Sequence, residues 1–525
     1  MTATQAKPHW RAGAGALVGA LAAAKLLLHL YAGRSYGYFI DELYNLALAR
    51  HLAWGYVDVA PMIALIGRVE LALLGSSLSA IRLAPALAGA ALVLLAGRLA
   101  RELGGGRFAQ GLAALCVLLA PGFLALDHFL NVNAFEPLCW MGCALILIRI
   151  LRTGNEKLWL WFGVVAGIGL ETKHSMLIFG FALVAGLLLT PERKHLFSRW
   201  LLLGGAAAFA IFLPNLLWNV QHHFPFLELQ ANIRADHRDV SLSLAGFFGQ
   251  EVLSMLPLAA PIWLVGLWSL LRGRYRALGL AWAIAAGIIF CMSPRIYYLF
   301  PAFPVLFAAG AVQFEQWLAG PRMPWIKPVW IKPVWIKPVW IKPVWCALMI
   351  AMGALLAPTL LPLLSPEGYI RYAAATHLEQ PRIETHKLGP LPQLFADQFG
   401  WEEMAAEVAR AYHALPADVQ ARTAIFGQNY GQAGAIDLFG PKYGLPPAIS
   451  GHQNYYLWGP HGATGESLIV MGDRQDVLER KCAAVRKVGR AEHPYSMPDQ
   501  HIDIFYCQGF KQPLAEVWPK VKNWH

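Results

Sequence analysis

The stretch that decides the fold reads AGAGALVGALAAAKLLLHLY and occupies residues 12–31. A helix needs about 20 predominantly apolar residues to cross a lipid bilayer, and this run is long enough. The segment before it, Met1 to Arg11, is polar and basic, and no small-residue cleavage motif marks the run as a removable signal peptide. We therefore expect residues 12–31 to form the first membrane-spanning helix.

Apolar runs of similar character recur along the first two thirds of the chain. The composition agrees, because charged residues make up 14% of the chain against about 25% in soluble domains. We predict about eleven spans, and an interfacial or re-entrant position for the apolar segment 62–75. The candidate spans after the first lie near 80–100, 108–126, 135–151, 158–170, 175–190, 200–217, 250–271, 277–292, 298–318 and 346–363.

The basic residues predict which side of the membrane each connection faces. With the amino-terminus in the cytoplasm, Arg and Lys gather in alternate connections, as the positive-inside rule requires. The net charge of +11 is then explained by the basic residues of the cytoplasmic connections, and it does not indicate nucleic-acid binding. We expect a multi-pass protein of a bacterial inner membrane, with a membrane domain over residues 1–363 and an extracytoplasmic domain over residues 364–525. The inside residues are Arg98, Arg101, Arg107, Arg149, Arg152, Lys157, Arg193, Lys194, Arg199, Arg272, Arg274 and Arg276, followed by Arg322 and the four lysines of the long loop after it.

Residues 325–345 repeat the pentapeptide WIKPV four times and close with Trp345. A proline at every fifth position removes amide donors and opposes an α-helix, so extended structure is expected. Tryptophan and lysine also suit a membrane surface. We favour a neutral expansion in a cytoplasmic loop over a lipid anchor.

The last third of the chain has the character of a small α/β domain. Segments 402–413 and 473–485 predict helices, and segments 422–426, 467–471 and 502–506 predict short strands. Two cysteines, Cys482 and Cys507, lie in this region. They could pair in an oxidising compartment, or remain two buried free thiols.

Ionisable residues near membrane depth are costly, so they are functional candidates. The first are Asp41 and Glu42, which follow the first span on the outer side. Two adjacent carboxylates suit a general base and its supporting acid, and neighbours on a helix point in different directions. The alternative is a hydrated pair that caps a helix.

Further polar residues fall at the same outer side. Lys173 and Arg295 are isolated cations that either extend to the membrane surface or together bind a lipid-linked phosphate. Tyr297 and Tyr298 adjoin Arg295 and join this predicted phosphate site. The predicted substrate contacts are Tyr56, Asp58, Asp127, His128, Asn133 and Glu136.

Carboxylates and cations in one outer cavity would suit sugar transfer from a lipid phosphate, because an attacking hydroxyl needs a base and a departing phosphate needs positive charge. A direct displacement would invert the anomeric centre. No metal is required with confidence, although the acidic residues could hold Mg²⁺ or Mn²⁺. A transporter or flippase for a lipid-linked sugar is the main alternative. A membrane-anchored binding or assembly protein, active through its tail, is a third.

Several short motifs resemble bacterial members of the protein O-mannosyltransferase superfamily, which includes the aminoarabinose transferase of lipid A and has the GT-C membrane fold. They are the Asp-Glu pair, Gly55-Tyr56-Val57-Asp58 with Pro61, NAFEP at 133–137, Arg295 to Tyr298, QNYGQAGA at 428–435 and SGHQNYYLWGP at 450–460.

The resemblance covers nearly the whole chain apart from the repeat. It implies a polyprenyl-phosphate sugar donor, an extracytoplasmic lipid, glycan or protein acceptor, and Asp41 as the catalytic acidic residue. Arg295, and more loosely Lys173, would contact the donor phosphate. Related chains often carry His-Pro-Pro where this one has Val59-Ala60-Pro61, so the resemblance carries less weight in that loop.

Overall fold

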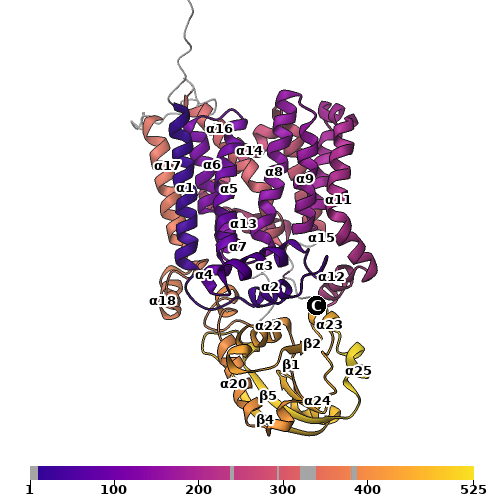
Figure 1. Ribbon diagram of the computed structural model, residues 1–525. Coiled ribbons are helices and arrows are strands. Elements are labelled where there is room, and N and C mark those ends of the chain that lie inside the picture. The colour runs from indigo at the N-terminus through magenta and orange to yellow at the C-terminus, as the bar shows by residue number, and fades with distance from the viewer. Residues whose placement is uncertain are drawn as a thin grey trace, which may run out of the picture.

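A computed structural model describes residues 10–236, 240, 242–292, 295–319, 338–378, 380 and 387–525. Long helices form a bundle, and a smaller domain with a β-sheet sits against one end of it (Figure 1). The amino-terminal end of α1 lies at the opposite end of the bundle from this domain. The chain is therefore a polytopic helical membrane protein with a C-terminal α/β domain, as the sequence predicts.

Each predicted span coincides with a helix or with a pair of helices. Six described helices are long and apolar enough to cross a membrane, and two bent pairs pass the same test when each is taken as one span. Three shorter apolar helices complete the set. The helices concerned are α1 (Trp10–Ala32), α5 (Leu83–Glu102), α6 (Arg107–Leu119), α8 (Val132–Thr153), α9 (Leu158–Thr172), α10 (Met176–Leu188), α11 (Arg199–Gln221), α13 (Leu244–Ser254) with α14 (Ala260–Arg272), α15 (Arg276–Met292), α16 (Phe303–Ala319) and α17 (Pro338–Leu356).

Glycines let the helices of the bundle approach closely. A Cβ on Gly163 of α9 would lie 1.9 Å from the carbonyl oxygen of Gly204 in α11. Likewise, a Cβ on Gly310 of α16 would lie 1.9 Å from the carbonyl oxygen of Ile262 in α14. Small residues at helix contacts are the usual solution in a bilayer, where packing replaces the hydrophobic effect between helices.

The two ends of the bundle differ in chemistry. Away from the soluble domain, Arg98, Arg149 and Arg152 all pair with the carboxylate of Glu102. At the domain end, short helices connect the spans: α2 (Ile40–Arg50), α3 (Met62–Leu74), α4 (Leu78–Ile81), α7 (Pro121–Leu126) and α12 (Pro225–Ala235). The apolar segment 62–75 is thus a short helix at this end, and in Figure 1 it lies beside α2.

The last unit of the WIKPV repeat is helical, which corrects the expectation of extended structure there. Helix α17 begins at Pro338, in the first turn where a missing amide costs nothing, and includes Pro343. Pro343 forfeits one hydrogen bond, yet the apolar run that follows continues the helix. Residues 325–337 of the repeat lie outside the described residues.

The C-terminal domain is built on a five-stranded mixed sheet of strand order β2-β1-β3-β5-β4. Strands β1 (Thr423–Gly427), β2 (Ala448–Ser450) and β3 (Ser467–Met471) run parallel, and β5 (Ile502–Phe510) and β4 (Cys482–Ala491) are antiparallel additions. Its helices are α18 (Pro366–Thr376), α19 (Gln393–Ala396), α20 (Trp401–His413), α21 (Ala417–Gln420), α22 (Tyr430–Phe439), α23 (Gln453–Trp458), α24 (Gln475–Lys481) and α25 (Leu514–Val517).

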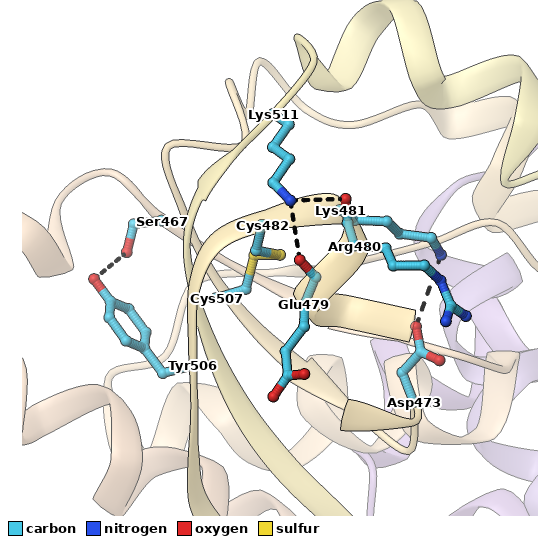
Figure 2. Close-up of a disulfide and its surroundings, with 9 residues drawn as sticks. All are labelled: Ser467, Asp473, Glu479, Arg480, Lys481, Cys482, Tyr506, Cys507 and Lys511. Carbon is cyan, nitrogen blue, oxygen red and sulfur yellow. Dashed lines mark hydrogen bonds and ion pairs between the residues drawn. A yellow bond between two sulfur atoms is a disulfide. The ribbon is translucent and has the colours of Figure 1, made fainter. Parts of the chain in front are cut away.

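The predicted helix over residues 473–485 is wrong beyond Lys481, because the chain enters β4 at Cys482. Pairing with β5 overrides the local sequence preference. Cys482 and Cys507 form a disulfide between these two strands, with their Cα atoms 5.8 Å apart (Figure 2). Beside it, the Lys511 ammonium donates to the carbonyl oxygens of Glu479 and Arg480 and so satisfies the end of α24.

Candidate functional site

A cavity of about 1800 Å³ lies where the bundle meets the C-terminal domain. Its membrane part is lined by apolar side chains of the spans, among them Leu177, Phe212 and Leu253. Its outer part is polar and is shared between the loops of the bundle and the soluble domain. A cavity with one apolar and one polar part suits an amphipathic ligand.

Asp41 lies in the first turn of α2 and lines this cavity. The Tyr430 hydroxyl, from the soluble domain, donates a hydrogen bond of 2.8 Å to Asp41 Oδ1. Asp58 lines the same wall and accepts a 2.9 Å hydrogen bond from the Tyr44 hydroxyl. The rings of Tyr44 and Tyr430 stack with centroids 4.6 Å apart. The wall thus carries two aspartates, each held by one of two stacked tyrosines.

The environment of Asp58 disfavours a charged carboxylate. Desolvation by the surrounding protein raises its pKa to about 7, and the nearby charge of Asp41 adds to the increase, whereas the Tyr44 hydrogen bond opposes it. The Asp58 carboxyl is therefore expected to change protonation near neutral pH. It lies close enough to Asp41 for the two charges to interact.

Glu42 has a structural position and does not line the cavity, which corrects its predicted share in catalysis. The Arg82 guanidinium donates to both of its oxygens, from Nε at 3.0 Å and from Nη2 at 2.8 Å. The backbone amides of Phe39 and Leu130 donate to the same carboxylate. With every oxygen occupied and no exposure to solvent, Glu42 fixes the start of α2 and leaves Asp41 as the carboxylate that faces the cavity.

Lys173 faces the same cavity from the end of α9. Its ammonium donates to Asn133 Oδ1 at 2.8 Å and to Glu136 Oε2 at 2.9 Å. It also lies 4.5 Å from the ring centre of Tyr298, a favourable cation–π distance. Glu136 lies behind Lys173 and does not line the cavity, so its predicted substrate contact becomes the role of fixing this cation.

Arg295 lines the same cavity and directly precedes the short 3₁₀ helix Ile296–Tyr298. Its Nη1 donates to the Tyr297 hydroxyl at 3.0 Å. Tyr297 and Tyr298 also line the cavity, and their contact with a phosphate stays a prediction. Two cations, two tyrosines and the Asn133 amide therefore meet in one wall.

Besides Glu136, three predicted substrate contacts lie away from the cavity. Tyr56 is buried and its hydroxyl contacts the backbone of the same loop. Asp127 is enclosed and pairs with Lys25 of α1 at 2.9 Å. His128 is enclosed beside His29, with ring centroids 6.1 Å apart. These side chains touch no open space, so they support the packing of the bundle end.

The residues suggested as metal ligands are dispersed. The carboxylates of Glu42 and Asp127 are taken by Arg82 and Lys25, and Asp41 is bonded to Tyr430. Across the described ranges, no group of three or more His, Cys, Asp or Glu side chains converges in a way that could hold a metal ion.

Sequence reasoning missed two contributors to the site. Arg82 is an ionisable residue in an apolar stretch, which is the one signal available, but only the fold shows that it meets Glu42. Tyr430 belongs to the QNYGQAGA motif, whose residues alone indicate no role in the site. A tyrosine in a soluble domain reveals its connection with a loop near residue 41 only when α22 is placed against α2.

Residues 58–218 match the family model described as dolichyl-phosphate-mannose-protein mannosyltransferase. A comparison with curated proteins found no match.

Solved structures share the fold. ArnT from Cupriavidus metallidurans bound to undecaprenyl phosphate aligns with a TM-score of 0.58 and 15% identity, over 93% of this chain and 97% of that one. The apo state of the same protein aligns with a TM-score of 0.57 and 17% identity, with the same coverage. The mycobacterial arabinofuranosyltransferase AftD aligns with a TM-score of 0.50 and 16% identity, over 94% of this chain and 40% of that one.

The matched segment runs from Asp58 to Trp218 and includes Asn133 and Lys173 of the cavity wall. The shared fold extends over nearly the whole chain, soluble domain included. Together, these findings show that residues 58–218 are similar to the mannosyltransferase family model and that the chain shares the fold of these solved structures over nearly its whole length.

Proposed function

We propose that the protein transfers a sugar from a polyprenyl-phosphate donor to an extracytoplasmic acceptor with inversion at the anomeric carbon. The observation that carries this proposal is that one cavity joins Asp41 to the cationic wall of Lys173 and Arg295. A base and a phosphate site in one enclosure meet the two needs of the reaction.

In the proposed reaction Asp41 accepts the proton of an acceptor hydroxyl. The hydroxyl oxygen forms a bond to the anomeric carbon while the bond from that carbon to the phosphate oxygen breaks. The electron pair of the broken bond stays on the departing polyprenyl phosphate, whose added charge Lys173 and Arg295 stabilise. A single displacement inverts the configuration.

The apolar part of the cavity suits the prenyl chain. Side chains from α10, α11, α13, α15 and α17 line it, so it runs along the spans toward the membrane interior. The similar ArnT structure was solved with undecaprenyl phosphate, which supports the same class of donor here. The acceptor would enter the polar outer part, and we propose a lipid, glycan or protein for it.

We further propose that the C-terminal domain lies outside the cytoplasm of a bacterial inner membrane. The arginines around Glu102 gather at the end of the bundle away from this domain, which is the cytoplasmic end under the positive-inside rule. The Cys482–Cys507 disulfide gives independent support, because disulfides persist in oxidising compartments.

The proposed chemistry needs no metal, since a carboxylate base and two cations supply both functions. Chelation tests this point: treatment of the protein with EDTA should leave the transfer rate unchanged. A loss of activity that Mg²⁺ or Mn²⁺ restores would instead give Asp41 a metal-binding role.

The experiment that tests the function compares lipids and surface glycans, by mass spectrometry, from cells with and without the protein. One sugar should be missing without it. Asp41→Asn should abolish the product while the protein still reaches the membrane. Asp418→Asn, an exposed acid of the soluble domain, is the matched control. Full product from Asp41→Asn would refute the assigned base, and donor lipid crossing the membrane without any transfer would instead indicate a flippase.

A further inference from the structure

We infer that the C-terminal domain completes the catalytic site: Tyr430 is a positioning residue for Asp41, and His452 fixes Tyr430. This inference rests on the proposed function, because it gives Asp41 the role of base. It adds to the proposed site two side chains of the C-terminal domain, Tyr430 and His452.

The contact between Tyr430 and Asp41 joins positions 389 residues apart. Tyr430 is the first residue of α22, and the Asn429 side chain caps that helix by accepting the amide of Gln432. The tyrosine therefore projects from a fixed helix start. Its hydroxyl donates to Asp41 Oδ1 at 2.8 Å, so the carboxylate is held in one orientation at the cavity wall.

The ring of Tyr430 is held on both faces. Tyr44 stacks on one side at 4.6 Å between centroids, and His452 stacks on the other at 4.8 Å with only 4° between the planes. Aromatic stacks of this kind contribute geometry as well as packing. The tyrosine is thus clamped between one ring from the membrane domain and one from the soluble domain.

His452 is itself oriented by hydrogen bonds. Its Nδ1 accepts a hydrogen bond of 3.0 Å from the backbone amide of Tyr430. Because Nδ1 is the acceptor, the neutral ring carries its proton on Nε2. Nε2 lies 3.3 Å from the backbone oxygen of His525. One tautomer therefore satisfies both contacts, and the imidazole plane that supports the Tyr430 ring is fixed.

The two helices that carry this contact are packed too closely to shift independently. A Cβ on Gly434 of α22 would lie 3.0 Å from the backbone carbonyl of Leu43 in α2. A Cβ on Gly431 would lie 2.5 Å from the Ile40 side chain. Because α2 also carries Asp41, the glycines set the distance between the base and its tyrosine.

The consequence for catalysis is specific. A hydrogen bond from a phenol to a carboxylate favours the charged form that a base needs, and it limits the directions from which the carboxylate can accept a proton. Loss of the hydroxyl alone should slow the chemical step and move the acid limb of the rate profile to higher pH, while donor binding on the cationic wall stays intact.

The test uses the full chain in detergent, supplied with undecaprenyl-phosphate-linked sugar isolated from the producing cells and with the acceptor identified by mass spectrometry. Tyr430→Phe keeps the stacked ring and removes only the hydroxyl that donates the hydrogen bond to Asp41. We expect kcat to fall by roughly tenfold or more, with KM for the donor unchanged and the acid limb moved to higher pH. His452→Phe keeps a ring on the stack but loses the Nδ1 acceptor, so a smaller loss of kcat is expected.

Tyr456→Phe is the matched control, because Tyr456 packs on Trp518 away from the cavity. A Tyr430→Phe variant with unchanged kcat, with a raised KM as its only defect, or with a lowered kcat and an unmoved acid limb would overturn the inference. Full activity of Asp41→Asn would instead overturn the proposed base itself, so the two failures are distinguishable.

Discussion

Arg82 and Glu42 form a two-point ion pair inside the protein, with side chains 2% and 0% exposed. Arg82 lies at the start of α5 and Glu42 in the first turn of α2, so the pair ties the loop that carries Asp41 to a membrane span. Removal of one partner of a buried pair leaves an uncompensated charge and costs about 3–5 kcal/mol.

We therefore expect Arg82→Ala to lower the melting temperature of the detergent-solubilised protein markedly, and the double replacement Arg82→Met with Glu42→Leu to recover much of it. Arg98→Ala serves as the control, because its side chain is 43% exposed. Equal melting temperatures for wild type and Arg82→Ala would show that the pair does not hold the loop.

Asp58 should make stability depend on pH. Its pKa is raised by burial to about 7 in the folded protein, above its ordinary value of 3.8. The folded state thus binds the proton more tightly, and stability declines as the pH rises from about 4 to about 7. Asp58→Asn should match the wild type near pH 4 and melt at a higher temperature than the wild type at pH 8. A melting difference that is the same at both pH values would contradict the assigned burial.

Lys173 should stabilise the negative charge of the departing phosphate. Lys173→Gln keeps a polar side chain of similar length but removes the charge, so kcat/KM for the donor should fall by roughly tenfold to a hundredfold. Lys442→Gln, at an exposed cation of the soluble domain, should leave the rate unchanged. Steady-state kinetics with the polyprenyl-phosphate donor decide between these outcomes.

The disulfide should stabilise the C-terminal domain by closing a loop with a sequence separation of 25. Conversion of both Cys482 and Cys507 to Ser should lower the free energy of unfolding by about 3 kcal/mol. Reductant should destabilise the wild type and leave the double variant unaffected. Cys291→Ser, at a free cysteine, is the control, and a response to reductant in the double variant would point to another cause.

The sequence predicts the membrane architecture well because long apolar runs and clustered arginines act locally. Each candidate span meets a helix, and Asp41, Lys173 and Arg295 line one cavity although they are far apart in the chain. The sequence fails where partners come from distant segments. From the sequence alone Glu42 is as good a catalytic candidate as Asp41, and only the contact with Arg82 shows that it is structural. Residues 482–485 have a helical sequence pattern, but they form a strand because they pair with β5.

The contact of Tyr430 with Asp41 also has a consequence for the biosynthesis of the protein. The aspartate is synthesised before its tyrosine, which follows 389 positions later in the chain. At roughly 5–20 residues per second, translation separates them by on the order of half a minute. Under the proposed function, the site is therefore completed only after the spans that line its cavity have been synthesised.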